Sequence, residues 1–178
     1  MFLQTQNKIM KILSIDPGYE RLGIAILEKK PREHSLENEK EVLVFSKCFK
    51  TSAKISHAER LSLIKNEVEE IIKKYKPKQL AIETLFFSSN QKTAFLVAEA
   101  RGVVISVSKS LGLDVFEYGP GQIKLAITGY GKSDKNAIIR MIPLLISIEN
   151  KKVKIKYDDE YDAIAVGITH FAINKNKI

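Results

Sequence analysis

The chain has 178 residues, of which 44% are apolar and 28% charged, so we expect one globular domain rather than a collagen-like or largely disordered chain. No apolar stretch is long enough to span a bilayer and the start of the chain lacks the apolar core of a secretory signal, so we expect a cytoplasmic protein with no membrane partner. A net charge of +8 favours a polyanionic partner, and nucleic acid is the first candidate.

The first part of the chain predicts a β-rich unit. Residues 1–9 are polar and aperiodic, and we expect them to be a disordered extension of a single domain over residues 10–178. Apolar runs bounded by turn residues predict three strands of an antiparallel meander, at 12–16, 22–27 and 41–49. Cys48 lies in the third strand and, as the single cysteine, excludes an internal disulfide and a multi-cysteine metal site.

The rest of the chain alternates helical and strand patterns. Apolar residues at three- and four-residue spacing predict helices at 57–76, 90–111, 122–127 and 158–173, and short apolar runs predict strands at 79–83 and 114–118. A further helix should follow Ser133 or Asp134, either of which can cap it, and Pro143 should kink or end that helix. This order predicts an α/β fold with a mixed five-stranded sheet, three antiparallel strands and then two parallel ones, flanked by helices on both faces.

Four carboxylates stand where such a fold can bring them together. Asp16 ends the first strand and Glu83 the fourth, while Asp159 and Asp162 lie three residues apart and therefore on one face of the last helix. Carboxylates on rigid elements are the oxygen ligands that two divalent cations bridging a phosphate require. Each acid also has a structural explanation, since Asp16 can organise its turn and the helix acids can interact with the helix dipole. Together the four favour a metal site.

Four segments of the chain, in order, resemble the RuvC family of Holliday junction resolvases: IDPGYERLGIAI, LAIETLFFSSNQKTAFLVAEARGV, FEYGPGQIKLAITGYGKSDK and YDDEYDAIAVGITH. They extend from about residue 10 to residue 170. The resemblance implies a ribonuclease H-like fold, a homodimer, and magnesium-dependent, paired symmetrical nicking of four-way DNA junctions in homologous recombination and DNA repair. It also implies catalytic, metal-binding acids at Asp16, Glu83, Asp159 and Asp162, with two Mg²⁺ ions per active site and Mn²⁺ able to substitute.

The same resemblance suggests how DNA is held. It places lysines near the phosphates at Lys124 and Lys135, of which Lys135 would stabilise charge in the transition state, and a base-stacking aromatic residue at Phe86. Tyr130 and Lys132, on the glycine-flanked loop before Lys135, are further candidates for DNA contact. Two alternatives remain open in the sequence. Asp158 shares a face with Asp162 as Asp159 does, and Phe87 stands beside Phe86.

Other partners and functions are also compatible with parts of the sequence. The apolar set of the helix at 90–111 is wider than one stripe, which favours a core on one side and a dimer partner on the other, with deep burial in a monomer as the alternative. A branch-migration complex of the RuvA/RuvB type is a further partner that the sequence neither requires nor excludes. The rival functions are a ribonuclease H-like nuclease that processes ribosomal RNA precursors and a module that binds junctions without cutting them.

Overall fold

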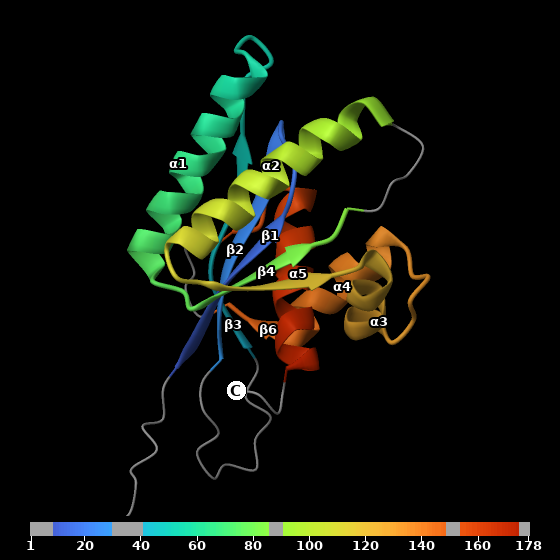
Figure 1. Cartoon of the computed structure of the whole chain (residues 1–178). Helices are drawn as coiled ribbons and strands as arrows, with labels where there is room; N and C mark the ends of the chain where they lie inside the picture. The colour runs from blue at the N-terminus through green and yellow to red at the C-terminus, as the bar shows by residue number, and fades with distance from the viewer. Residues whose placement is uncertain (1–8, 30–40, 86–90, 149–153, 175–178) are drawn as a thin grey trace, which may run out of the picture.

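The computed structural model describes residues 9–29, 41–85, 91–148 and 154–174. Within these residues one mixed sheet lies between two layers of helices (Figure 1). The strands are β1 (Met10–Asp16), β2 (Arg21–Lys29), β3 (Glu41–Lys50), β4 (Gln79–Glu83), β5 (Asp114–Tyr118) and β6 (Ile146–Ser147). The helices are α1 (His57–Tyr75), α2 (Gln91–Ser110), α3 (Pro120–Thr128), α4 (Lys135–Leu145) and α5 (Asp158–Ile173). No helix in these ranges is long and apolar enough to cross a membrane.

The strand order across the sheet is β5-β4-β1-β2-β3-β6. β2 pairs antiparallel with both β1 and β3, whereas β4 pairs parallel with β1 and with β5. The α/β class and the five predicted strands are therefore confirmed. The sequence did not predict β6, a two-residue strand that pairs parallel with the start of β3, because so short a segment directly after a helix carries no period of its own.

The helix boundaries follow local signals in the sequence. Ser56 caps α1 by accepting the amide proton of Glu59, and of the two candidate caps of α4 it is Asp134 whose carboxylate accepts the amide proton of Ala137 at 2.7 Å. Pro143 lies in the last turn of α4, and the helix ends two residues later at Leu145. Pro143 thus ends the helix, as the sequence predicts.

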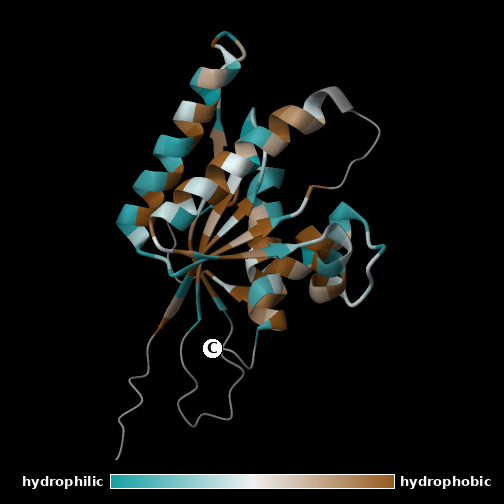
Figure 2. Ribbon diagram, in the orientation of Figure 1, coloured by the Kyte–Doolittle hydropathy of each residue, from teal (hydrophilic) through white to brown (hydrophobic). Residues whose placement is uncertain are grey.

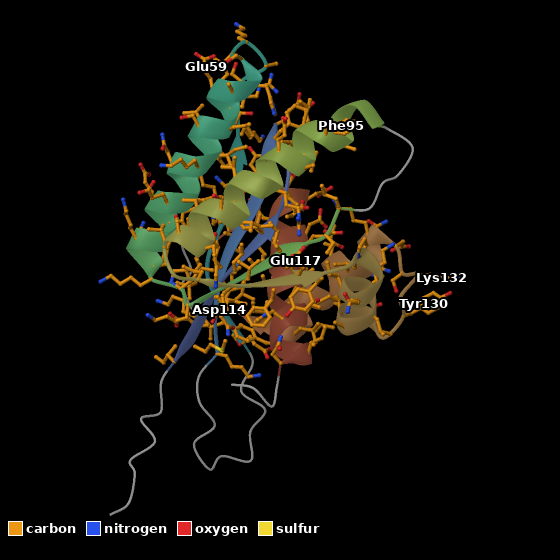
Figure 3. The ribbon with its side chains drawn as sticks, in the orientation of Figure 1. Glu59, Phe95, Asp114, Glu117, Tyr130 and Lys132 are labelled. Carbon is orange, nitrogen blue, oxygen red and sulfur yellow. The ribbon has the colours of Figure 1, made fainter. Side chains whose placement is uncertain are left out.

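The two faces of the sheet carry separate hydrophobic cores. Figure 2 shows the hydrophobic residues that run along the strands between the helix layers. Alternate residues of β1 face opposite sides, so Leu13 and Ile15 pack under α1 and α2, whereas Ile12 packs under α5. On the first face the inner side of α2 is buried, but Phe95 at its outer side is 69% exposed (Figure 3). The broad apolar set of α2 is thus only partly used by the core of this chain.

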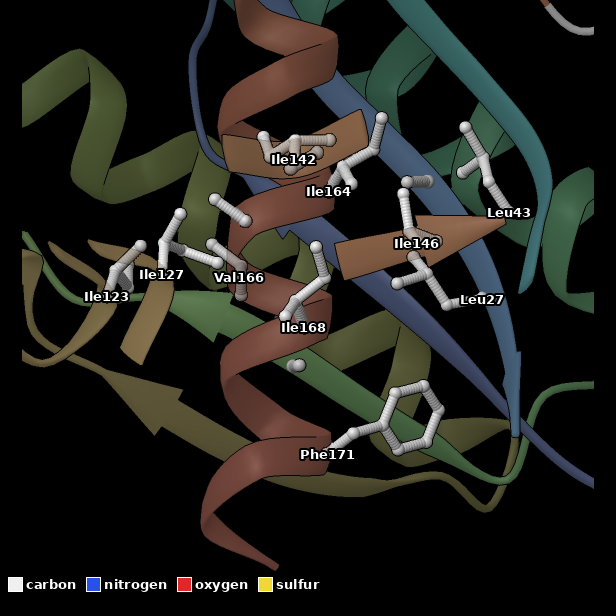
Figure 4. Packing of buried hydrophobic residues seen from close by; sticks show 14 of the residues in the cluster. Leu27, Leu43, Ile123, Ile127, Ile142, Ile146, Ile164, Val166, Ile168 and Phe171 are labelled. Carbon is white, nitrogen blue, oxygen red and sulfur yellow. The ribbon is translucent and has the colours of Figure 1, made fainter. Parts of the chain in front are cut away.

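Helix α5 is the centre of the second core. Its apolar side chains pack with those of α3, α4 and the sheet (Figure 4). Gly167 allows α5 to lie directly on the sheet, because a Cβ built at this position would stand 2.8 Å from both Leu27 and Ser14. This close packing determines where the N-terminal end of α5, with its acidic residues, lies over the sheet.

Some predictions fall outside the described residues. These include residues 1–8 of the predicted extension and both Phe86 and Phe87 of the candidate base-stacking segment. The division into a disordered extension and one domain over residues 10–178 stays a prediction.

Candidate active site

Three of the predicted acids line one cavity. Asp16 and Glu83 end the neighbouring parallel strands β1 and β4, so both carboxylates lie at the same edge of the sheet, and Asp162 reaches this edge from α5. The cavity has a volume of about 270 Å³, and Lys124 of α3 and Lys135 of α4 line it as well. Acids from the sheet and from α5 therefore face lysines from the α3–α4 pair.

The start of α5 is held against the sheet by two features of the strands. Gly23 lies opposite Asp16 in the β1–β2 register, and a Cβ built on it would stand 2.0 Å from the backbone oxygen of Asp159. Glu160 is buried, and its carboxylate accepts hydrogen bonds from Ser46 Oγ at 2.5 Å and from the amide of Tyr157 at 3.2 Å. Glu160 therefore anchors the first turn of α5 to β3, and this contact fixes the direction of Asp162.

Glu83 is held in place from the other face of the sheet. Arg101 of α2 donates its Nε proton to the backbone oxygen of Glu83 at 3.1 Å, and its terminal nitrogen pairs with Glu117 of β5. The sequence left Arg101 without an assigned role. Its contacts show that it ties the end of β4 to β5 and α2, so that the carboxylate of Glu83 is presented from a rigid strand end.

The carboxylates of the cavity destabilise one another's charges. Burial raises the pKa of Asp16 well above its usual range, and the negative charges of Asp162 and Glu83 add to that shift. Burial likewise raises the pKa of Glu83 to about 7, with a further contribution from Asp162 and a smaller opposing one from Lys124. A cation bound among these groups would remove the repulsion that raises their pKa values.

Lys135 supplies one positive charge to this cluster. It is the first residue of α4, and its Nζ donates a hydrogen bond to Asp162 at 2.9 Å and lies 3.5 Å from Asp158. Burial alone would lower the pKa of Lys135, but the hydrogen bond and the charges of Asp162 and Asp158 raise it. Lys135 is thus a charged ammonium at the rim of the cavity, between the acids and the solvent.

Asp159 lies beside the cavity rather than in its lining. Its carboxylate pairs with the guanidinium of Arg21 from β2, and the same oxygen lies 3.5 Å from the Cys48 thiol of β3. Partial burial would raise the pKa of Asp159, but the hydrogen bond from Arg21 and its charge hold it below the usual range. The alternative acid, Asp158, is exposed and faces Lys135. The two candidates for the fourth acid therefore point to different neighbours.

The donor set of the cavity suits a hard divalent cation. Asp16, Glu83 and Asp162 offer carboxylate oxygens from two strand ends and a helix. The positive charges near them do not fully offset the repulsion among these carboxylates. In the described part of the chain no group of three Asp, Glu, His or Cys side chains is already arranged to hold a metal ion. Metal binding would therefore draw these carboxylates closer together.

The remaining DNA-binding candidates lie on the side of the cavity formed by α3 and α4. Tyr130 is 62% exposed and Lys132 is also exposed, and both stand on the loop between these helices (Figure 3). The hydroxyls of Thr128 and Ser133 bridge the loop at 2.6 Å, which fixes its conformation. Phe86, the predicted base-stacking residue, lies outside the described residues.

Sequence reasoning missed three residues that shape the site. Gly23 was detectable, because a glycine inside a buried strand is typical of a close backbone approach. The contacts of Arg21 and Cys48 with Asp159 were not, since these residues are separated from it by more than a hundred positions and meet only in the folded chain.

Comparisons with known proteins show the family of the chain. The sequence pattern of the family described as crossover junction endodeoxyribonuclease RuvC matches residues 12–170. The crossover junction endodeoxyribonuclease RuvC of Brachyspira hyodysenteriae is 39% identical over 166 residues, which are 93% of this chain and 96% of that protein. Its counterpart from Fusobacterium nucleatum is 37% identical over 161 residues, 90% of this chain and 80% of that protein.

A solved structure is similar over nearly the same length. Thermus thermophilus RuvC in complex with a Holliday junction substrate superposes with a TM-score of 0.79 and 27% identity, covering 93% of this chain and 95% of that one.

Proposed function

The chain belongs to the RuvC family of crossover junction endodeoxyribonucleases, and on this premise we propose how its own residues resolve a Holliday junction. The observation that carries the proposal is the cavity in which Asp16, Glu83 and Asp162 lie beside Lys124 and Lys135. This cavity therefore brings together acids that can bind cations and lysines that can bind phosphate. This combination suits hydrolysis of a phosphodiester bond.

Asp16, Glu83 and Asp162, joined by Asp159, would hold two Mg²⁺ ions, for which Mn²⁺ can substitute. Bound there, the ions supply Lewis-acid chemistry that makes water nucleophilic at neutral pH and neutralises charge on the leaving 3′ oxygen. The raised pKa values of Asp16 and Glu83 support this assignment, because buried carboxylates that repel one another gain most from divalent cations.

The lysines act on the phosphate. Lys135 would leave Asp162 and donate to a nonbridging oxygen of the scissile phosphate, where it would stabilise the charge that develops in the transition state. Lys124, on the same wall of the cavity, would position the adjacent phosphate. Lys132 and Tyr130 extend this wall outward along the loop between α3 and α4, and Phe86 would stack on an unpaired base near the junction centre.

A homodimer would provide the two active sites that paired, symmetrical nicks require. Phe95 supports the proposal that α2 contributes to the interface, because a ring exposed on the outer side of α2 would be covered by a second copy of the chain. A RuvA/RuvB-type branch-migration complex would be a further partner of the dimer on DNA.

One assay separates this proposal from its rivals. The protein is incubated with an end-labelled four-way junction, a plain duplex, a replication fork and a structured ribosomal precursor RNA, each with Mg²⁺ or with a chelator. We expect Mg²⁺-dependent paired nicks in the junction with 5′-phosphate and 3′-hydroxyl ends. Cleavage of the RNA instead would favour the RNA-processing nuclease, and binding without cleavage would favour the binding module.

Substitutions assign the chemistry to the cavity. Asp16→Asn, Glu83→Gln and Asp162→Asn should each abolish cleavage and leave junction binding intact or tighter, because a negative charge that faces the phosphates is removed. Asp114→Asn is the matched control, since this exposed acid starts β5 at the opposite end of the strand from the cavity. Loss of junction binding in all three folded variants would contradict the proposal.

A further inference from the structure

Arg21 forms a contact that the chemistry proposed above does not use. Its guanidinium, at the start of β2, pairs with Asp159 Oδ2, and the Cys48 thiol lies 3.5 Å from the same oxygen. Both partners come from the strands, and neither Arg21 nor Cys48 belongs to the lining of the cavity. Asp159 is therefore paired with a cation from the sheet, just as Asp162 is paired with Lys135 of α4.

Arg21 also belongs to an exposed basic rim. It lies opposite Lys50 in the β2–β3 register, and the ring of Tyr157 lies close to both, 3.7 Å from Lys50 Nζ and 5.5 Å from Arg21 Cζ. The side chain of Arg21 is 46% exposed. A phosphate that approaches the cavity from this side can therefore reach Arg21 and Lys50 together, and a guanidinium binds phosphate through two parallel hydrogen bonds.

The exchange of partners is energetically accessible. A partly exposed ion pair such as Arg21–Asp159 favours its closed form by about fivefold or less. A DNA phosphate offers the guanidinium an equivalent anion, and a divalent cation offers the carboxylate a stronger partner than the guanidinium. When DNA and a divalent cation are both present, Arg21 can bind the phosphate and Asp159 can bind the cation. The ion pair between them therefore opens at little cost in free energy.

We infer that Arg21 is a positioning residue that holds Asp159 beside the cavity in the free protein and releases it when a DNA phosphate binds Arg21. The inference rests on the proposed metal-dependent cleavage. It implies that the last metal ligand becomes available mainly on DNA, and that DNA and metal each raise the affinity of the protein for the other by the same factor. The free protein would thus bind divalent cations less tightly than the DNA-bound protein.

Binding of Mn²⁺ to the DNA-free protein tests the first half of the inference, with electron paramagnetic resonance as the readout. Arg21→Gln should bind Mn²⁺ about fivefold more tightly than wild type, which corresponds to about 1 kcal/mol. In the Asp159→Asn background, Arg21→Gln should leave the affinity for Mn²⁺ unchanged. An equal gain with and without Asp159 would mean that Arg21 acts only as a nearby positive charge, and this would overturn the inference.

Two further variants sharpen the test. Arg21→Lys keeps a cation that can reach Asp159 and should retain most of the wild-type behaviour, whereas Lys50→Gln removes an equal charge from the same rim without a described contact to Asp159. Lys50→Gln should therefore leave Mn²⁺ affinity in the DNA-free protein unchanged. A gain as large as that of Arg21→Gln would contradict the specific role of the Arg21–Asp159 pair.

The second half of the inference, the release of Asp159 when DNA binds, is tested by measuring junction affinity with and without Ca²⁺. Ca²⁺ replaces Mg²⁺ so that the junction is bound without being cut. Ca²⁺ should raise the junction affinity of wild type more than that of Arg21→Gln. If Ca²⁺ raises junction affinity by the same factor in wild type and in Arg21→Gln, the role of Arg21 is overturned. The proposed function stays intact in that case, provided that wild type cuts the junction with Mg²⁺. Failure of wild type to cut with Mg²⁺ would be a failure of the proposed function itself.

Discussion

Asp16 and Gly23 face each other across the β1–β2 ladder, and the missing side chain of Gly23 makes room for the backbone of Asp159. The strand end that presents Asp16 is thus packed directly against the helix that presents two other proposed metal-binding acids, Asp159 and Asp162. Because the backbone of α5 touches the sheet here, the distance between Asp16 and Asp162 is set by main-chain packing rather than by flexible side chains. This arrangement holds the carboxylates in place despite their repulsion.

Gly23→Ala should disrupt both the fold and the activity. The added Cβ would stand 2.0 Å from the Asp159 oxygen, so the first turn of α5 must move, at a cost of about 1–3 kcal/mol. We expect a lower melting temperature and a loss of cleavage larger than the loss of junction binding. Gly121→Ala is the control, because nothing lies within 4 Å of its Cβ position. Equal stability of Gly23→Ala and wild type would show that α5 is not held at this point.

The raised pKa of Glu83 predicts an unusual dependence of stability on pH in the absence of metal. Its pKa is about 7 in the folded chain and near the ordinary value of 4.5 when unfolded, so the folded state binds more protons between these limits. The contribution of Glu83 to the free energy of unfolding is therefore largest below pH 4.5 and falls as the pH rises through 7.

Glu83→Gln isolates that contribution. In chelator, the melting temperature of the variant should rise relative to that of wild type as the pH increases from 4.5 to 8, because only wild type acquires a buried charge. Addition of Mg²⁺ at pH 8 should stabilise wild type more than the variant. A difference in melting temperature that stays constant over this pH range would show that the environment of Glu83 does not penalise its charge.

Lys135→Ala should slow cleavage at saturating enzyme by about 100-fold, because its ammonium would stabilise charge that develops on the phosphate. Single-turnover rates with excess enzyme separate this effect from affinity. Lys109→Ala, which removes an exposed lysine at the far end of α2, is the matched control. If Lys135→Ala weakens junction binding and leaves the single-turnover rate unchanged, Lys135 only positions the DNA.

The order of the elements could be predicted from the sequence because it depends on local signals. Short apolar runs bounded by turn residues identified the five main strands, and apolar residues at three- and four-residue spacing, with the cap before α4, identified all five helices of the described chain. Two features depended on tertiary packing instead. β6 exists because it meets the start of β3, and α5 is buried on several sides because Gly167 brings it onto the sheet.

In the site, too, some features follow from local sequence signals and others depend on tertiary packing. Asp16 and Glu83 could be identified because each ends a buried strand, where an unpaired charge is costly without a function. Which first-turn acid of α5 has which role could not be predicted. Glu160 turns inward to Ser46, Asp159 to Arg21 and Asp158 to Lys135, and these partners come from distant parts of the chain.

Phe86→Ala tests the predicted base-stacking residue, whose position lies outside the described residues. If its ring stabilises an unstacked base, the substitution forfeits about 1–3 kcal/mol on an intact junction. A junction with an unpaired base at the cleavage point should recover most of the lost rate, because it needs less of that help. Equal loss on both substrates, with a lower melting temperature, would make Phe86 a core residue and move the stacking role to Phe87 or Tyr130.

Phe95 tests the dimer. The ring is 69% exposed on α2, and a second copy of the chain would cover it, so Phe95→Arg should shift the protein from dimer to monomer in sedimentation at micromolar concentration. Leu144→Arg is the matched control, because Leu144 of α4 is 62% exposed on the opposite face of the sheet. The monomeric variant should nick junctions singly rather than in linked pairs, since each protein then carries one active site. A wild-type protein that sediments as a monomer while making paired nicks would require the second active site to assemble only on DNA.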